Sequence, residues 1–245
     1  MRTFLFLVGF LIFGAAQGQV TTTQMAKNLS NDEENGIYEL PELKFKVLSD
    51  GTITDSLKRK VAKLEVEESF FIEKLFYLVK NNDLIILANF SNSDEGYSSV
   101  EKVDLKSKKV IWTTNLPGFN LFEGVAEHNY LYAGVIGLAA KIDLRDGTIV
   151  WKHDNLYNRY KCNHFKNIVV KDKTVDFVGI SPVLGKDRIL YNELLYFTFN
   201  KITGEMITFK KSSGGNKQPT IIYQKKKPTN IIQQKNIEVT PKPVK

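Results

Sequence analysis

The sequence predicts an all-β fold assembled from repeated units of four antiparallel strands, and three observations lead to this prediction. First, KIDLRDGTIVW at 141–151 nearly repeats KVDLKSKKVIW at 102–112. Second, each copy reads as a strand, a tight polar turn and a second strand. Third, two more strand-like runs precede each copy. Four short strands in roughly 40 to 57 residues make one β-propeller blade, so we expect about four blades in a closed or open arrangement.

The repeated hairpin indicates which positions matter to the unit. Asp104 and Asp143 close the first strand of each copy, and Trp112 and Trp151 occupy the second strand. Asp-Gly, which ends at Gly147 in the later copy, is a strong signal for a two-residue turn because glycine tolerates positive φ. We expect the Trp to fill the gap between neighbouring blades.

Two weaker copies extend the series. In the later one, Leu195–Phe209, the Asp position is taken by Asn200 and the turn ends at Gly204. Phe209 replaces the Trp with a slip of one residue. A faint earlier copy, VLSDGTI, predicts an equivalent turn at Gly51.

Upstream strands complete each strong unit. Short runs rich in β-branched and aromatic residues, divided by polar turns, predict these strands. They span 75–80 and 84–90, then 123–127 and 130–136, then 167–170 and 175–180.

These motifs resemble the repeat of the quinoprotein-like (PQQ-like) β-propeller family, which runs apolar, Asp, Leu, x, Thr or Asp, Gly, x, apolar, apolar, Trp. The resemblance covers roughly 75–210. In that family the Asp, the turn and the Trp are structural, so the resemblance implies a fold and no chemistry. The family's dehydrogenases are far longer, with eight blades, a bound calcium and paired adjacent cysteines, so the resemblance implies a short, non-enzymatic member. The implied structural positions are Asp104, Trp112, Asp143, Gly147, Trp151, Asn200, Gly204 and Phe209.

The N-terminus predicts export. Residues 1–18 combine Arg2, a ten-residue apolar run and the small residues of a cleavage site, which is the pattern of a signal peptide. That run is too short to span a bilayer, which needs about 20 residues. No Cys follows it, so we expect a secreted or periplasmic chain without a lipoprotein anchor or a transmembrane segment. Residues 19–40 are poorly patterned and predict a disordered lead-in to a domain at 41–211.

The charge excess lies at the other end. Residues 211–245 hold eight Lys and one Glu, so the remaining chain carries 26 basic and 26 acidic side chains. The high isoelectric point therefore belongs to the tail, and we expect no basic face from it on the folded part. Residues 212–245, rich in Lys and Pro, predict a disordered tail. Such a tail is either a solvated extension or a tether to anionic lipid or polysaccharide.

No catalytic or cofactor site is indicated. Cys162 is the one cysteine, so no internal disulfide is possible, and we expect it to be buried. His153 and His164 lie near it but lack the spacing of a metal site. Neither a nucleophile elbow nor a glycine-rich phosphate loop is present. We therefore expect no catalytic residues, no cofactor and no metal.

Two aromatic segments are the candidate partner-binding surface. LPGFNLF at 116–122 links the first complete blade to the second, and NLYNRYKCNHF at 155–165 links the second to the third. Connections between blades run across one face of a propeller, where partners bind. The candidate residues are Phe119, Phe122, Tyr157, Arg159 and Tyr160. The alternative is that these aromatic side chains pack beneath the loops.

These observations favour a non-enzymatic scaffold that recognises a protein partner through its loop face. Two alternatives stay open: a small extracellular hydrolase or lyase acting on a polymer, and a tethering protein that works through its tail. Nucleic acid is not an expected partner, because a secreted chain seldom meets it and no stacking array is present. The oligomeric state is open, and an incomplete ring could close as a dimer.

Overall fold

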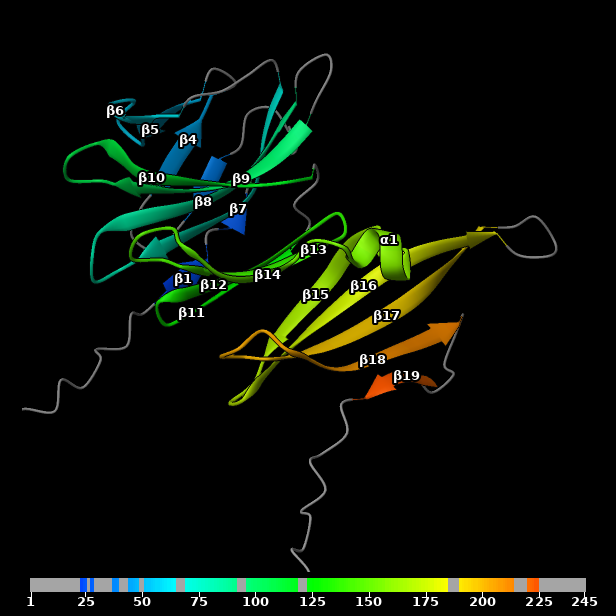
Figure 1. Ribbon diagram of the computed structural model, residues 1–245. Coiled ribbons are helices and arrows are strands. Elements are labelled where there is room, and N and C mark those ends of the chain that lie inside the picture. Colours follow the sequence, from blue (N-terminus) through cyan, green and yellow to red (C-terminus); the bar gives the residue numbers. More distant parts are fainter. Residues whose placement is uncertain are drawn as a thin grey trace, which may run out of the picture.

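The computed structural model describes residues 23–25, 27–28, 37–39, 44–48, 51–64, 69–91, 96–118, 123–184, 190–213 and 220–224. These residues form four antiparallel sheets and one short helix, α1 (Leu156–Tyr160) (Figure 1). The helix has five residues, and no helix in the described part is long and apolar enough to cross a membrane. The predicted all-β, blade-based fold class is confirmed.

The sheets follow one another along the chain, and each is named here by its place. The N-terminal sheet contains β2 (Lys27–Asn28), β3 (Ile37–Glu39), β4 (Lys44–Val47), β5 (Thr52–Asp55) and β6 (Lys60–Lys63). The first blade contains β1 (Thr23–Met25), β7 (Ser69–Leu78), β8 (Asp83–Ser91), β9 (Gly96–Asp104) and β10 (Lys109–Leu116). The second blade contains β11 (Glu123–Glu127), β12 (Tyr130–Val135), β13 (Leu138–Asp143) and β14 (Ile149–His153). The third blade contains β15 (His164–Val170), β16 (Thr174–Leu184), β17 (Leu190–Asn200), β18 (Met206–Ser213) and β19 (Thr220–Gln224).

Alternating side chains bury both faces of the inner sheets. In β8, Leu84 and Ile86 face the N-terminal sheet, while Ile85 and Leu87 face the second blade. This period of two gives three apolar cores, one at each of three junctions between successive sheets. Figure 1 shows the resulting row, with the N-terminal sheet and the third blade at opposite sides of the molecule. The row is an open, incomplete propeller.

Strand boundaries differ from the predicted lead-in and tail. β1, β2 and β3 lie within 19–40, and β1 pairs with β7 of the first blade. β18 runs past residue 211, and β19, which lies in the predicted tail, pairs with β18. These segments gain backbone hydrogen bonds from the open edge of a sheet, which weak side-chain patterning does not reveal.

An Asp or Asn organises the turn that joins the last two repeat strands of each sheet. The Oδ1 of Asp104 accepts a hydrogen bond from the backbone N–H of Lys106, at 2.7 Å. Asp143 accepts from Arg145 at 2.9 Å, and Asn200 accepts from Ile202 at 2.9 Å. This geometry is an Asx-turn, so these repeated positions hold the hairpins in shape.

The N-terminal sheet has the same turn at a place the sequence did not predict. Gly51 lies in the earlier turn, between β4 and β5. The equivalent residue is Asp55, whose Oδ1 accepts from Leu57 and Arg59, both at 2.9 Å. The prediction of an equivalent turn at Gly51 is therefore corrected: VLSDGTI imitates the motif but belongs to the preceding hairpin.

The two tryptophans pack on the turn of the next blade. A Cβ added to Gly147 would lie 2.8 Å from the ring of Trp112, and one added to Gly204 would lie 2.5 Å from Trp151. Both glycines have positive φ, at +78° and +74°. Glycine is thus required twice over, by the turn conformation and by the ring lying against it.

Phe209 does not take the role of these tryptophans. Its side chain lies in the core between the second and third blades, with its ring centroid 4.3 Å from that of Tyr160. Trp112 and Trp151 instead face the blade that follows their own. A slip of one residue turns a side chain to the other face of a strand, so Phe209 points back toward the second blade.

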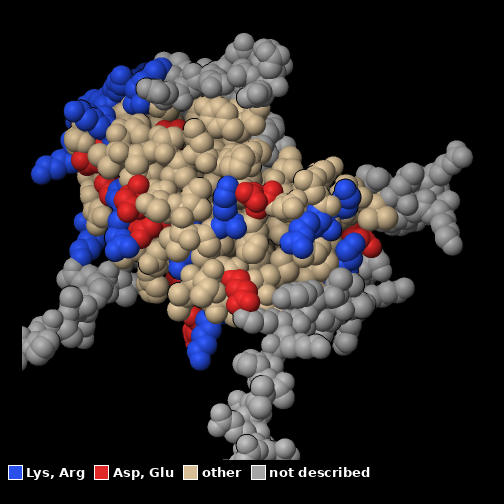
Figure 2. Space-filling view, viewed as in Figure 1, with Lys and Arg blue, Asp and Glu red and all other residues tan. Residues whose placement is uncertain are grey.

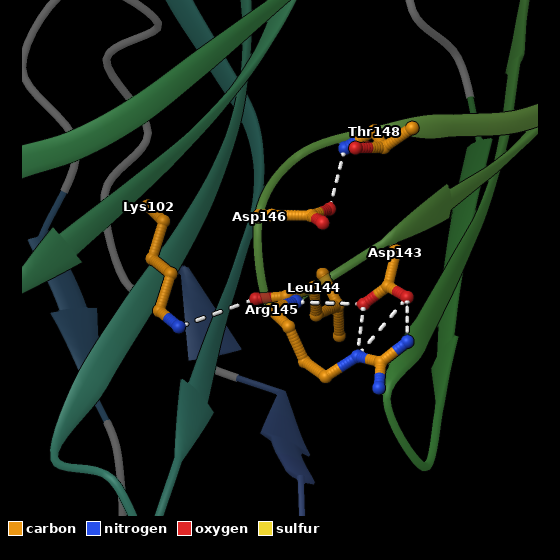
Figure 3. A network of polar contacts seen from close by, with 6 residues as sticks. All are labelled: Lys102, Asp143, Leu144, Arg145, Asp146 and Thr148. Atoms are coloured by element: carbon orange, nitrogen blue, oxygen red, sulfur yellow. Dashed lines mark hydrogen bonds and ion pairs between the residues drawn. The ribbon is translucent and has the colours of Figure 1, made fainter.

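A buried lysine forms a second repeated contact between blades. The Nζ of Lys102 donates to the carbonyl oxygen of Leu144 at 3.2 Å (Figure 3). The same Nζ pairs with Asp83 of its own blade at 3.1 Å. One blade later, the Nζ of Lys141 donates to the carbonyl oxygen of Lys201 at 3.0 Å. Each of these lysines stands two residues before the turn Asp of its own blade. Each donates to the backbone carbonyl of the residue that follows the turn Asp or Asn of the next blade. The repeat therefore encodes the stacking of blades as well as each hairpin.

Candidate functional site

The connections between blades (117–118 and 154–163) and the β12–β13 turn (136–137) lie at one end of the sheets, which is called here the connection face. The opposite end carries the Asx-turns and is called the turn face (56–59, 105–108, 144–148 and 201–205). The connection face holds α1, which links β14 to β15 beside β13 and β16 (Figure 1). A Cβ on Gly118 would lie 3.3 Å from the carbonyl oxygen of Ile136, so the connection after the first blade touches the β12–β13 turn of the second blade.

The short helix is fixed at both ends. At its start, the N–H of Leu156 donates to the carbonyl oxygen of Gly137 at 2.9 Å, and the Leu156 side chain is buried. At its end, Lys161 adopts φ of 59°, and its N–H donates to the carbonyl oxygen of Tyr157 at 2.7 Å. A left-handed residue at this position satisfies carbonyl groups that a helix would otherwise leave unpaired.

Tyr157 is exposed to solvent, and its backbone is held by close contacts. Its side chain is 48% exposed, although its backbone lies against the β12–β13 turn. A Cβ on Gly137 would lie 2.5 Å from the Cβ of Tyr157, and Gly137 has φ of +63°. The Nζ of Lys161 lies 5.6 Å from the Tyr157 ring centroid, within the range of a cation–π contact.

The other candidate residues divide between surface and core. Arg159 is exposed, with its guanidinium carbon 6.0 Å from the Tyr160 ring centroid. Tyr160 is half-buried, and its ring packs on those of Phe197 and Phe209 at 5.5 Å and 4.3 Å. The structure thus leaves both Tyr157 and Arg159 exposed on α1, while Tyr160 packs partly into the core. Phe119 and Phe122 lie outside the described residues.

The cysteine and histidines near this face are held in structural contacts. Cys162 is fully buried, and burial raises the pKa of its thiol to about 12, so the thiol is protonated at neutral pH. The Nε2 of His153 lies 2.7 Å from the carbonyl oxygen of Gly204, and its ring stacks on Phe199 at 4.5 Å. Desolvation lowers the pKa of His164. Within the described ranges, no group of three or more His, Cys, Asp or Glu side chains is placed to hold a metal ion.

A second feature was not predicted from the sequence. A groove of about 610 Å³ opens between β6 of the N-terminal sheet and β9–β10 of the first blade, and four lysines line it. Figure 2 shows Lys and Arg gathered over this region, at the upper left. The lysines come from sequence positions about 50 residues apart, so no local run of the sequence indicates them. A balanced net charge for the folded part does not exclude such a local excess.

Fold and surface together define a β-propeller-type repeat protein with an exposed connection face. No family model and no curated protein matches the sequence. Among solved structures, a europium-containing methanol dehydrogenase is similar at 10% identity and a TM-score of 0.39, over 53% of this chain and 23% of that one. Drosophila Semaphorin 1a, extracellular domains 1–2, is similar at 11% identity and a TM-score of 0.39, over 82% of this chain and 45% of that one. The Pan2 WD40 domain of Neurospora crassa is similar at 8% identity and a TM-score of 0.28, over 82% and 78%.

These similarities are too weak to bear on function. The chain spans about a quarter of the dehydrogenase and less than half of the semaphorin chain. The resemblance to quinoprotein-like repeats therefore stands at the level of a propeller-like fold.

Proposed function

We propose that this chain is a non-catalytic recognition module that acts outside the cytoplasm and binds a protein partner through its connection face. The observation that carries the proposal is the exposure of Tyr157 on a helix that is fixed at both ends. Tyrosine and arginine are the residue types most often found at the energetic centres of protein interfaces. Here the exposed Tyr157 and Arg159 stand on the same short helix.

Rigidity strengthens this proposal. A side chain on a preformed surface loses less conformational freedom on binding than one on a loose loop. Buried Leu156 and the close contact at Gly137 hold the backbone of Tyr157 in place before any partner arrives. The half-buried Tyr160 supports the helix from below through Phe209.

Affinity capture from the extracytoplasmic fraction of the source organism tests the proposal. The full mature chain is compared with Tyr157→Ala/Arg159→Ala, and the captured partner is then titrated against both. We expect the double variant to bind at least about tenfold more weakly, because hot-spot side chains contribute roughly 1–2 kcal/mol or more each. Its thermal stability should be unchanged, since both side chains are exposed.

A matched control uses exposed apolar residues of the opposite end. Leu57 and Ile202, which are 69% and 79% exposed, lie in turns of the turn face. The variant Leu57→Ala/Ile202→Ala should bind the partner like the unmodified chain. Loss of binding in this control, with full binding by the Tyr157 variant, would move recognition to the turn face and overturn the proposal.

A further inference from the structure

The groove beside β6 exists because two neighbouring strands differ in length. β6 has four residues and lies against β10, which has eight. The N-terminal sheet therefore covers only part of the facing surface of the first blade. The turn before β6 has its positive-φ residue at Lys58, and Ala62 stands four residues later. In the next two sheets, Trp112 and Trp151 stand four residues after the equivalent turn residue. The first junction therefore lacks the large aromatic side chain that the two following junctions have at this position.

The walls of the groove are basic. Lys60 and Lys63 line it from the N-terminal sheet, and Lys108 and Lys109 line it from the β9–β10 turn. Lys60, Lys108 and Lys109 are exposed, and none of them takes part in an ion pair within the described residues. Among the described residues that line the groove, one carboxylate, that of buried Glu101, faces these lysines, and it accepts a hydrogen bond from Ser99 at 3.2 Å. Among the described lining residues positive charge is thus in excess, and a concave space strengthens its attraction for anions.

The floor and rim of the groove carry groups suited to a sugar. The ring of half-buried Tyr97 stacks on buried Phe90, with centroids 5.1 Å apart and the planes inclined by 11°. Exposed Thr113 and Asn115 add a hydroxyl and an amide along β10. Aromatic faces receive the apolar face of a sugar ring, while hydroxyl and amide groups exchange hydrogen bonds with sugar hydroxyls.

From these groups we propose that the groove binds an acidic polysaccharide. Lysines recognise anionic groups as point charges, without the paired geometry with which arginine grips a phosphate. Four lysines spread over two sheets therefore suit a polymer with repeated single charges. The groove volume falls within the roughly 300–1,000 Å³ of ligand sites, so it accommodates a short oligosaccharide. This site is separate from the connection face, and it does not depend on the proposed protein partner.

Calorimetric titration of the full mature chain with a short oligogalacturonate tests the proposal. Lys60→Gln/Lys109→Gln should bind about tenfold more weakly, with a weaker dependence on salt, because two contact charges are removed. Two control variants should bind within about twofold of the unmodified chain. The first, Lys166→Gln/Lys173→Gln, removes exposed lysines of the third blade. The second, Lys225→Gln/Lys226→Gln/Lys227→Gln, removes lysines of the tail.

A parallel titration with poly-glutamate of matched charge separates a sugar site from an acidic-peptide site. We expect poly-glutamate to bind more weakly than the oligogalacturonate. Equal or tighter poly-glutamate binding that depends on Lys60 and Lys109 would replace the proposal with an acidic-peptide site. Binding that is lost in the tail variant and kept in the groove variant would assign it to the tail. Absence of oligogalacturonate binding in the folded, unmodified chain would also overturn the proposal.

Discussion

At the scale of single residues, the side-chain oxygen of one Asp or Asn shapes the turn of each sheet. The turn Asp or Asn of each sheet accepts backbone hydrogen bonds that define the hairpin. The sequence predicted three of the four, because Asp104, Asp143 and Asn200 stand in the repeated pattern. It missed Asp55, whose turn lacks glycine and whose following strand has Ala62 in place of a Trp. The Asx-turn is therefore present in this sheet although the glycine and the Trp that would indicate it in the sequence are absent.

The buried turn Asp143 predicts a pH dependence of stability. The Arg145 guanidinium, which hydrogen-bonds to it, holds the pKa of the Asp143 carboxyl below its ordinary value of 3.8 (Figure 3). A carboxyl whose pKa is lower in the folded state stabilises the protein above its unfolded pKa and loses that contribution as pH falls through its folded pKa. The contribution is therefore present above pH about 4 and declines below it.

Chemical denaturation between pH about 2 and 6 measures this effect. Asp143→Asn keeps an oxygen for the Asx-turn, as Asn200 does in the third blade, but it loses the charge. We expect the variant to be less stable than the unmodified protein at pH about 6 and the difference to shrink toward pH about 2. A difference that stays constant over this range would show that the charge of Asp143 does not stabilise the fold.

At the scale of elements, patterning predicted the strands of the three complete blades but not how their faces are used. The strands predicted at 84–90 and 175–180 fall within β8 and β16, which are longer by one or a few residues at their ends, and the strand predicted at 130–136 ends one residue past β12. The aromatic loop at 155–165 contains α1, which the sequence did not predict because a five-residue helix is too short to show a helical pattern. The prediction that Phe209 replaces the Trp is wrong, because Phe209 stands one position later in its strand and successive side chains point to opposite faces. Burial and register, which the sequence does not state, decide these outcomes.

The buried ion pair between neighbouring strands β8 and β9 of the first blade predicts a large effect for Lys102. Its Nζ pairs with Asp83, and both side chains are less than 10% exposed. We expect Lys102→Met to lower the free energy of unfolding by about 3 kcal/mol, because it leaves a buried carboxylate without its partner. Equilibrium denaturation in urea measures the loss.

The double variant Lys102→Met/Asp83→Asn controls for this interpretation. Removing both charges should recover a substantial part of the loss, since the uncompensated charge is then gone. If the double variant is as unstable as the single one, the cost arises from packing at the junction and the ion pair is not responsible.

At the scale of the whole molecule, repeated junctions hold the four sheets in one row. Apolar cores fill all three junctions, and the second and third junctions each add a tryptophan on a glycine turn and a lysine on a backbone carbonyl. The repeat in the sequence predicted the units and their order. It did not predict the basic groove, because β6 and the β9–β10 turn meet only after the sheets stack. Both proposed binding surfaces depend on this stacking.

Gly147→Ala tests the stacking most directly. Its Cβ would meet the Trp112 ring in the first blade and force an unfavourable φ, so we expect a loss of roughly 2 kcal/mol or more. Lys108→Gly is the matched control at the equivalent turn, where Lys108 has φ of 58°, and it should not destabilise the protein.

Native-state hydrogen exchange of the full chain is the decisive measurement. If the sheets form one cooperative stack, Gly147→Ala should lower the protection of amides in β8, β12 and β17 by a common amount. A loss confined to the strands beside Gly147, with β17 fully protected, would show that the blades unfold as separate units and would contradict the account.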